Sequence, residues 1–275
     1  MRVEILGGGA GGDSDPDSDS DSDPDVAIVG GIHGDEPCGV AAVEDLLESR
    51  PDVARPVKLV IASEEAVARG TRYVDTDLNR AFPGDPDGQS LESRLAYRLG
   101  EEVGDCVTLA LHSTRSYGGM FALVDEVDDL ARDVCPGLSV DALVETGAPE
   151  GRIFESVPDT IEVECGYQGS AEATENAKRV AREFLGATGV LPGAAADRRS
   201  DLPVFRLGDP VPKRAAETYE VFAENFEEVV AGEAFAAVDG EPVVADEHFH
   251  PVLMSAYGYE DVFGYTAERV GWLSE

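Results

Sequence analysis

Short runs of consecutive apolar residues alternate along this chain with segments whose apolar residues recur at helical spacing. The runs at residues 26–29, 57–62 and 107–111 predict buried strands, because a strand covered on both faces has little need of polar side chains. Strands are expected at residues 2–6, 26–29, 57–62, 107–111, 121–124 and 160–165, and helices at residues 37–49, 90–103 and 171–185. This alternation predicts an α/β fold, a layered mixed sheet flanked by helices.

The chain changes character after residue 185. Residues 186–200 are rich in Gly, Ala and Pro and read as a linker. Beyond it, short strand candidates are separated by turn residues, and they lie at residues 204–205, 219–221, 234–238 and 243–244. We therefore expect a first domain of residues 1–190 and a small, β-rich C-terminal domain of residues 200–275.

A glycine run near the N-terminus formally contains the pattern G-x-G-x-x-G. A dinucleotide site of that kind needs a helix to begin there, so that its N-terminus can receive the pyrophosphate. Residues 13–25 instead alternate Asp with Ser and Pro, which disfavours a helix and repels phosphate. We predict a solvated, disordered acidic loop at residues 13–25 and no nucleotide site.

The charge balance excludes several classes of partner. The chain has 21 basic and 56 acidic residues and a net charge of −35, so it has no basic surface for nucleic acid or anionic lipid. No apolar run approaches the roughly 18 residues that span a bilayer, and the N-terminus does not read as a signal peptide. We therefore expect a cytoplasmic protein. Because only Lys58, Lys178 and Lys213 are lysines, the composition resembles that of halophilic proteins.

Two of the four histidines follow predicted buried strands. His33 precedes Glu36 by three residues, and His112 ends the strand at residues 107–111. Ligand sites in parallel α/β sheets form at the carboxyl ends of strands. Two histidines and one carboxylate are also the protein ligands of many catalytic zinc sites. The sequence therefore suggests that His33, Glu36 and His112 share a metal ion.

Four motifs occur in one order along the chain. They are GGIHGDEPCG at residues 30–39, RYVDTDLNRAFPG at residues 72–84, LHST at residues 111–114 and IEVECG at residues 161–166. In this order they resemble the aspartoacylase and succinylglutamate desuccinylase family, whose members are relatives of zinc carboxypeptidases. The resemblance covers residues 26–185 well and the C-terminal part more loosely.

The resemblance implies one zinc ion per chain, held by His33, Glu36 and His112. It also implies that Glu164 is the general base, because the family places this residue just before a short residue and Gly. Glu162 lies two residues earlier on the same strand face and competes with Glu164 on sequence alone.

The same resemblance assigns the substrate contacts. It places Asn79 and Arg80 at the substrate carboxylate, where the planar guanidinium can donate two parallel hydrogen bonds. It makes Arg72 the residue that polarises the scissile carbonyl and stabilises the oxyanion.

Further candidates depend on looser alignment. Arg152 matches another family arginine or forms a surface salt bridge. A substrate tyrosine is expected near the C-terminus, and Tyr257 and Tyr259 both qualify. The spacing of His248 and His250 suits one strand face, but no third ligand is near, so a solvated strand edge is the better interpretation.

The four cysteines are widely spaced, which is typical neither of a disulfide framework nor of a thiolate zinc site. Cys38 and Cys165 adjoin candidate site residues. A nucleophilic cysteine would need a histidine base of its own, so we expect both to be packing residues.

These features together predict a zinc-dependent hydrolase that cleaves the amide bond of an N-acyl amino acid. A zinc carboxypeptidase acting on peptides is one alternative, and a non-catalytic binding module on the same fold is another. The expected partner is a small-molecule substrate, with no nucleic acid and no membrane. The acyl group, the amino acid and the oligomeric state, a homo-oligomer included, are left open.

Overall fold

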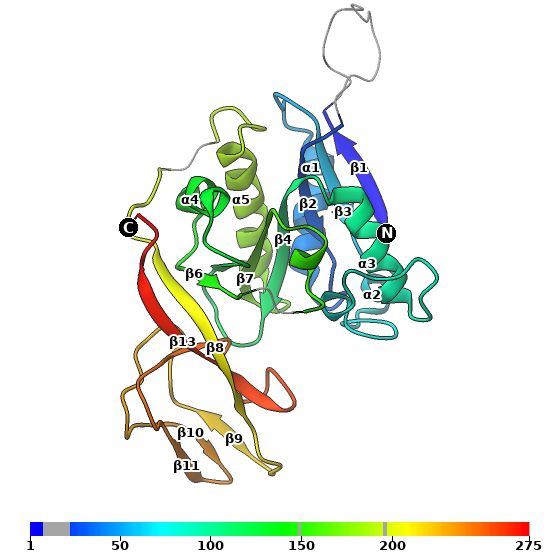
Figure 1. Cartoon of the computed structure of the whole chain (residues 1–275). Helices are drawn as coiled ribbons and strands as arrows, with labels where there is room; N and C mark the ends of the chain where they lie inside the picture. The colour runs from blue at the N-terminus through cyan, green and yellow to red at the C-terminus, as the bar shows by residue number, and fades with distance from the viewer. Residues whose placement is uncertain (8–22, 148–149, 195–196, 275) are drawn as a thin grey trace, which may run out of the picture.

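The computed structural model describes residues 1–7, 23–147, 150–194 and 197–274. Its main feature is a mixed sheet with the strand order β1-β3-β2-β4-β7-β5-β6-β8-β13-β12 (Figure 1). The first part of the chain supplies β1 (Arg2–Leu6), β2 (Val26–Gly30), β3 (Val57–Ile61), β4 (Val107–Thr114), β5 (Phe121–Val124), β6 (Ala142–Glu145) and β7 (Thr160–Tyr167). The C-terminal part adds β8 (Pro203–Pro212), β12 (His250–Val252) and β13 (Val262–Trp272). The predicted α/β class is confirmed.

Strands β3, β2, β4 and β7 run parallel and form the centre of the sheet. Every residue of β2 is buried, and alternate side chains enter two different cores. Val26 and Ile28 pack with the helices α1 (Pro37–Ser49) and α5 (Ala171–Ala187), whereas Ala27 and Val29 pack with α3 (Leu91–Val103). The continuous apolar run of β2 therefore follows from helices on both faces of the sheet.

The remaining elements are short or lie in the C-terminal part. The helices α2 (Glu64–Arg69) and α4 (Asp129–Val134) and the 3-10 turns at Leu78–Arg80, Cys135–Gly137 and Ile153–Glu155 connect the strands. A separate antiparallel sheet contains β9 (Tyr219–Val221), β10 (Ala234–Val238) and β11 (Glu241–Val244). No helix in the described part of the chain is both long and apolar enough to cross a membrane.

The C-terminal part differs from the expected short strands. Strand β8 spans ten residues, rather than residues 204–205 alone, and β13 spans eleven. Strand β8 pairs in parallel with β6, so residues 203–272 extend the main sheet as well as forming the small one. The domain division at residues 190–200 stays a prediction.

Two interpretations fall on undescribed residues. Most of the acidic loop predicted at residues 13–25, and the glycine run except for Gly7, lie outside the described part of the chain.

Candidate metal and substrate site

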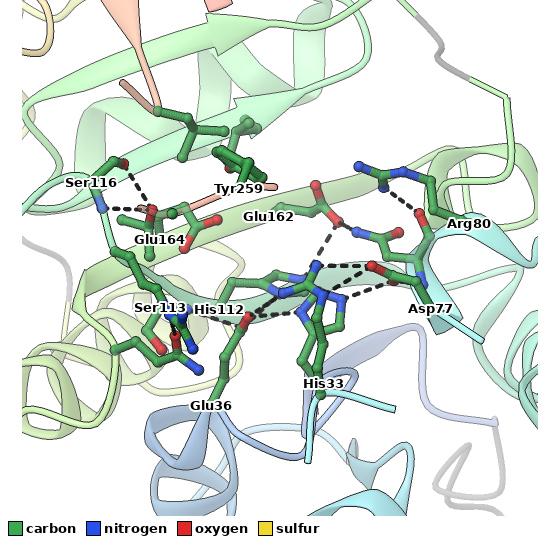
Figure 2. A pocket seen from close by; sticks show the side chains of 18 of the residues that line it. His33, Glu36, Asp77, Arg80, His112, Ser113, Ser116, Glu162, Glu164 and Tyr259 are labelled. Carbon is green, nitrogen blue, oxygen red and sulfur yellow. Dashed lines mark hydrogen bonds and ion pairs between the residues drawn. The ribbon is translucent and has the colours of Figure 1, made fainter. Parts of the chain in front are cut away.

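A cavity of about 820 Å³ lies at the carboxyl ends of β2, β4 and β7. The residues predicted to hold a metal line it together with most of those predicted to bind substrate (Figure 2). They are His33, Glu36, Arg72, Asn79, Arg80, His112, Arg152, Glu164 and Tyr259. The cavity is therefore at the place where parallel α/β sheets form their ligand sites.

Close backbone contacts bring the three candidate metal ligands together. His33 lies on the segment after β2, Glu36 immediately precedes α1, and His112 belongs to β4. A Cβ atom on Gly30 would lie only 2.4 Å from the backbone of Gly39, the third residue of α1. Only glycine lets α1 start this close to β2, and the start of α1 brings Glu36 between the two histidines (Figure 2).

The two histidine rings face Glu36 through the same ring atom. His33 Nδ1 lies 2.8 Å from Glu36 Oε1, and His112 Nδ1 lies 3.1 Å from Glu36 Oε2. All three residues are buried, and one ligand atom from each lies within 4.8 Å of the others. In the described part of the chain, this is the one group of three or more such residues that could hold a metal ion.

The opposite ring atoms have carboxylates of their own. His33 Nε2 lies 3.1 Å from Asp77 Oδ1, and His112 Nε2 lies 3.5 Å from Glu162 Oε1. A neutral imidazole whose Nε2–H faces a carboxylate keeps a lone pair on Nδ1. Carboxylates behind the rings are the usual support of histidine metal ligands. Two imidazole nitrogens and one carboxylate, with room for a fourth ligand, fit zinc.

The same contacts determine the ionisation of these groups. Burial by itself lowers the pKa of His33, but the nearby carboxylates Glu36 and Asp77 outweigh it and raise the pKa. Burial likewise opposes the charged form of Glu36, yet the two histidines hold its pKa well below the usual range. The site thus favours an ionised Glu36 between the two histidines.

Glu162 and Glu164 have different surroundings although they lie on the same face of β7. Glu162 accepts a hydrogen bond from Asn79 Nδ2 at 2.6 Å and another from Arg152 Nη2 at 2.7 Å, and it also faces His112. Glu164 Oε2 is buried and has no hydrogen-bond partner in the described part of the chain. Burial and the charge of Glu36 raise the pKa of Glu164 to about 7. Glu162 is thus committed to its neighbours, whereas Glu164 is available to a bound molecule.

The two arginines predicted to contact the substrate also differ in whether the protein itself supplies a carboxylate partner. Arg72 donates to Asp77 Oδ2 at 3.0 Å and to Glu36 Oε1 at 3.2 Å, which places it beside the candidate metal ligands. Arg80 bonds to the backbone carbonyl of Asn79, and no carboxylate in the described part of the chain forms an ion pair with it. Asn79 itself is buried and engaged, because its Oδ1 also accepts from the backbone N–H of Ile153 at 3.0 Å.

Tyr257 and Tyr259 have different locations. Tyr259 lines the cavity, and Figure 2 shows it close to Glu164. Tyr257 is 63% exposed and does not line the cavity, and its hydroxyl accepts a hydrogen bond from the backbone N–H of Tyr219. Of the two candidates, Tyr259 alone can contact a molecule bound there without a rearrangement of the chain.

The remaining candidates lie outside the metal group. His248 is exposed and lies 4.0 Å from Glu228, and the ring of His250 packs against Phe205 at 5.2 Å. All four cysteines are free and buried, and Cys38 donates to the backbone carbonyl of His112. These contacts agree with packing roles for the cysteines.

The sequence motifs predict no role for Asp77, and they offer Glu162 only as an alternative base. The structure brings both behind the histidine rings. Asp77 lies in the motif at residues 72–84, and its place in this motif is the one sequence feature that could have indicated a role. Its partnership with His33 joins residues 44 positions apart and could not be read from spacing.

The fold and the triad define a mixed α/β protein with a candidate three-ligand metal site at the carboxyl ends of its strands. The family model of the succinylglutamate desuccinylase/aspartoacylase catalytic domain matches residues 22–125. A succinylglutamate desuccinylase/aspartoacylase from Rhodobacter sphaeroides has a similar fold, with a TM-score of 0.73 and 21% identity over 90% of this chain and 86% of that one. Residues 22–125 of the chain are thus similar to the catalytic domain of the succinylglutamate desuccinylase/aspartoacylase family, as the motifs indicated.

Curated relatives match different lengths of the chain. An aspartoacylase of Xenopus tropicalis is 36% identical over 121 residues, which cover 38% of this chain and 39% of that protein. An N-acyl-aromatic-L-amino acid amidohydrolase (carboxylate-forming) of Xenopus laevis is 26% identical over 82% of this chain and 79% of its own length. The match thus spans about two fifths of the aspartoacylase.

Proposed function

We propose that this protein is a zinc-dependent amidohydrolase that removes the acyl group from an N-acyl amino acid. The observation that carries the proposal is the position of the His33–Glu36–His112 triad in one cavity with Arg80 and Glu164. Chemistry of this kind needs a metal, a base and a fixed anchor for the substrate, and the cavity contains groups suited to each.

Arg80 is the proposed anchor of the substrate carboxylate. Its guanidinium has no carboxylate partner in the described part of the chain, so it could donate two parallel hydrogen bonds to a bound carboxylate. Asn79 precedes it and, through Glu162 and the backbone of Ile153, fixes the backbone that carries Arg80. Arg152 and Tyr259 are further candidates for contact with the substrate, because they line the same cavity.

The catalytic roles follow from position. His33, Glu36 and His112 would hold the zinc ion, which would supply Lewis-acid polarisation of the amide carbonyl and a water whose pKa is lowered to about 7. Arg72 lies beside Glu36 and would stabilise the negative charge that develops on the carbonyl oxygen. Glu164 would accept a proton from the attacking water and then donate it to the leaving amine.

The test is hydrolysis of a panel of N-acyl amino acids, compared with dipeptides, by protein before and after removal of metal by a chelator. We expect N-acyl amino acids to be cleaved, activity to disappear with the metal, and zinc to restore it. Cleavage of dipeptides alone would favour a carboxypeptidase. Binding of N-acyl amino acids without cleavage, by zinc-loaded protein, would favour a non-catalytic module and overturn the proposal.

A further inference from the structure

Residues 72–80 form a loop that carries Arg72 at one end and Asn79 and Arg80 at the other. Its ends are held by the contacts of Arg72 with Asp77 and of Asn79 with Glu162. Its middle, residues 74–76, belongs to no helix or strand. No backbone carbonyl in the described part of the chain accepts a hydrogen bond from the N–H groups of these three residues.

The carboxylate of Glu92 accepts from all three of them. Its Oε1 lies 2.7 Å from the backbone nitrogen of Val74, and its Oε2 lies 3.1 Å from that of Asp75 and 3.2 Å from that of Thr76. Glu92 is completely buried, and no ion pair with a basic residue is present in the described part of the chain. Three N–H donors, together with the positive end of the α3 dipole, compensate for burial of the charge.

Helix capping does not account for Glu92. The N-cap of α3 is Ser90, whose hydroxyl already accepts from the backbone N–H of Ser93 at 3.1 Å. The Glu92 side chain instead crosses to the loop. The contact is reciprocal, because Asp75 Oδ2 accepts from the backbone N–H of Leu91 at 2.8 Å. Four hydrogen bonds thus join the middle of the loop to the start of α3.

We infer that Glu92 is a positioning residue for substrate binding: it holds the 72–80 loop on the start of α3, so that Arg80 stays where it meets the substrate carboxylate. The inference rests on the proposed function. Glu92 does not line the cavity, so it would act through the loop and not by touching the substrate.

The test uses the full-length, zinc-loaded protein and the variant Glu92→Gln. In glutamine an NH2 group, which can only donate, replaces one carboxylate oxygen of Glu92. The backbone hydrogen bonds that this oxygen accepts are therefore lost. We expect the backbone amides of residues 74–76 to exchange hydrogen at least about tenfold faster. We also expect KM for the N-acyl amino acid to rise about tenfold, the equivalent of one hydrogen bond to a charged group, while kcat changes less than about threefold.

Glu101→Gln is the matched control. It makes the same substitution on the same helix, but Glu101 is exposed and has no described hydrogen bond. It should leave both amide exchange and KM unchanged. Zinc content should equal that of the wild type in both variants, because neither residue contacts the triad.

Two results would overturn the inference. One is wild-type exchange at residues 74–76 in Glu92→Gln, and the other is faster exchange or lower stability with an unchanged KM, which would mean a purely structural role. A wild type that cleaves no N-acyl amino acid would instead refute the proposed function, and the exchange data would still report whether Glu92 holds the loop. If Glu92→Gln does not fold, Asp75→Ala removes the reciprocal bond at an exposed position and should raise KM about threefold.

Discussion

His33 and His112 direct Nδ1 toward Glu36 because each has a carboxylate behind Nε2. The triad was predictable from sequence, since H-x-x-E and a later histidine each follow an apolar strand. The supporting carboxylates Asp77 and Glu162 were not, because they come from a different loop and a different strand. At the scale of single residues, the sequence therefore indicated the ligands but not what orients them.

The first prediction separates the two glutamates of β7. Glu164→Gln should retain zinc and lose about 10²-fold or more in kcat, because the amide cannot accept the proton. Glu162→Gln should weaken zinc binding about 10–100-fold, since Glu162 faces the ring of His112. Metal analysis and steady-state kinetics of both variants decide it. If Glu164→Gln were fully active and Glu162→Gln were inactive but still loaded with zinc, the general base would be Glu162 and not Glu164.

The second prediction concerns the metal ligands. His112→Ala should lose zinc and activity together, because it removes one of three buried ligands. His248→Ala is the control, since this histidine is exposed and does not belong to the candidate metal group. Both proteins would be dialysed against the same zinc buffer and their zinc content measured. Equal zinc content in the two variants would contradict the proposed ligand set.

At the scale of elements, Asn225 links two loops beside the cavity. Its Nδ2 donates to the backbone carbonyls of Ser116, at 2.8 Å, and Met254, at 3.2 Å, and its Oδ1 accepts from the backbone N–H of Met254 at 2.8 Å. Ser116 lies on the connection after β4, and Met254 lies between β12 and Tyr259. One side chain thus joins the C-terminal part of the chain to the segment that follows the candidate metal ligand His112.

The third prediction tests this link. Asn225→Ala should lower the free energy of unfolding by about 1–3 kcal/mol, because the backbone groups around it lose their partners. It should also raise KM, since the segment that carries Tyr259 is less well held. Glu224→Ala, an exposed neighbouring position, should change stability by less than about 0.5 kcal/mol. Denaturant unfolding and kinetics of the pair provide the measurement, and an unchanged KM in Asn225→Ala would refute the positional effect.

At the scale of the whole molecule, the charge of −35 is the dominant property. Acidic side chains repel one another over about 10 Å at 0.1 M salt but over only about 3 Å at 1 M. Repulsion at low salt destabilises the compact state. The similarity of the composition to that of halophilic proteins stays a prediction, and salt dependence is its physical consequence.

The fourth prediction follows from this repulsion. The fold should be lost as sodium chloride falls well below molar, and Tm should rise with salt above that point. Circular dichroism across a salt series measures both, and a parallel series in sucrose controls for general solvent exclusion effects. A signal that stays flat down to dilute buffer would show that the acidic surface does not limit stability.

The sequence by itself determined the α/β class, the family resemblance and the three candidate metal ligands. Buried central strands and amphipathic helices have periodicities that local sequence reveals, and the motifs are contiguous. Strand β13 has no such pattern, because only some of its residues are buried and its pairing with β8 shifts register three times. It could not be predicted from local sequence.

Tertiary structure alone decided how the side chains meet. It separated Tyr259, which lines the cavity, from the exposed Tyr257, and it distinguished the fully bonded Glu162 from Glu164. It also brought Glu92 to the backbone of residues 74–76. Such contacts depend on the packing of distant segments, and hydrogen bonds that form only after packing have no signature in local sequence.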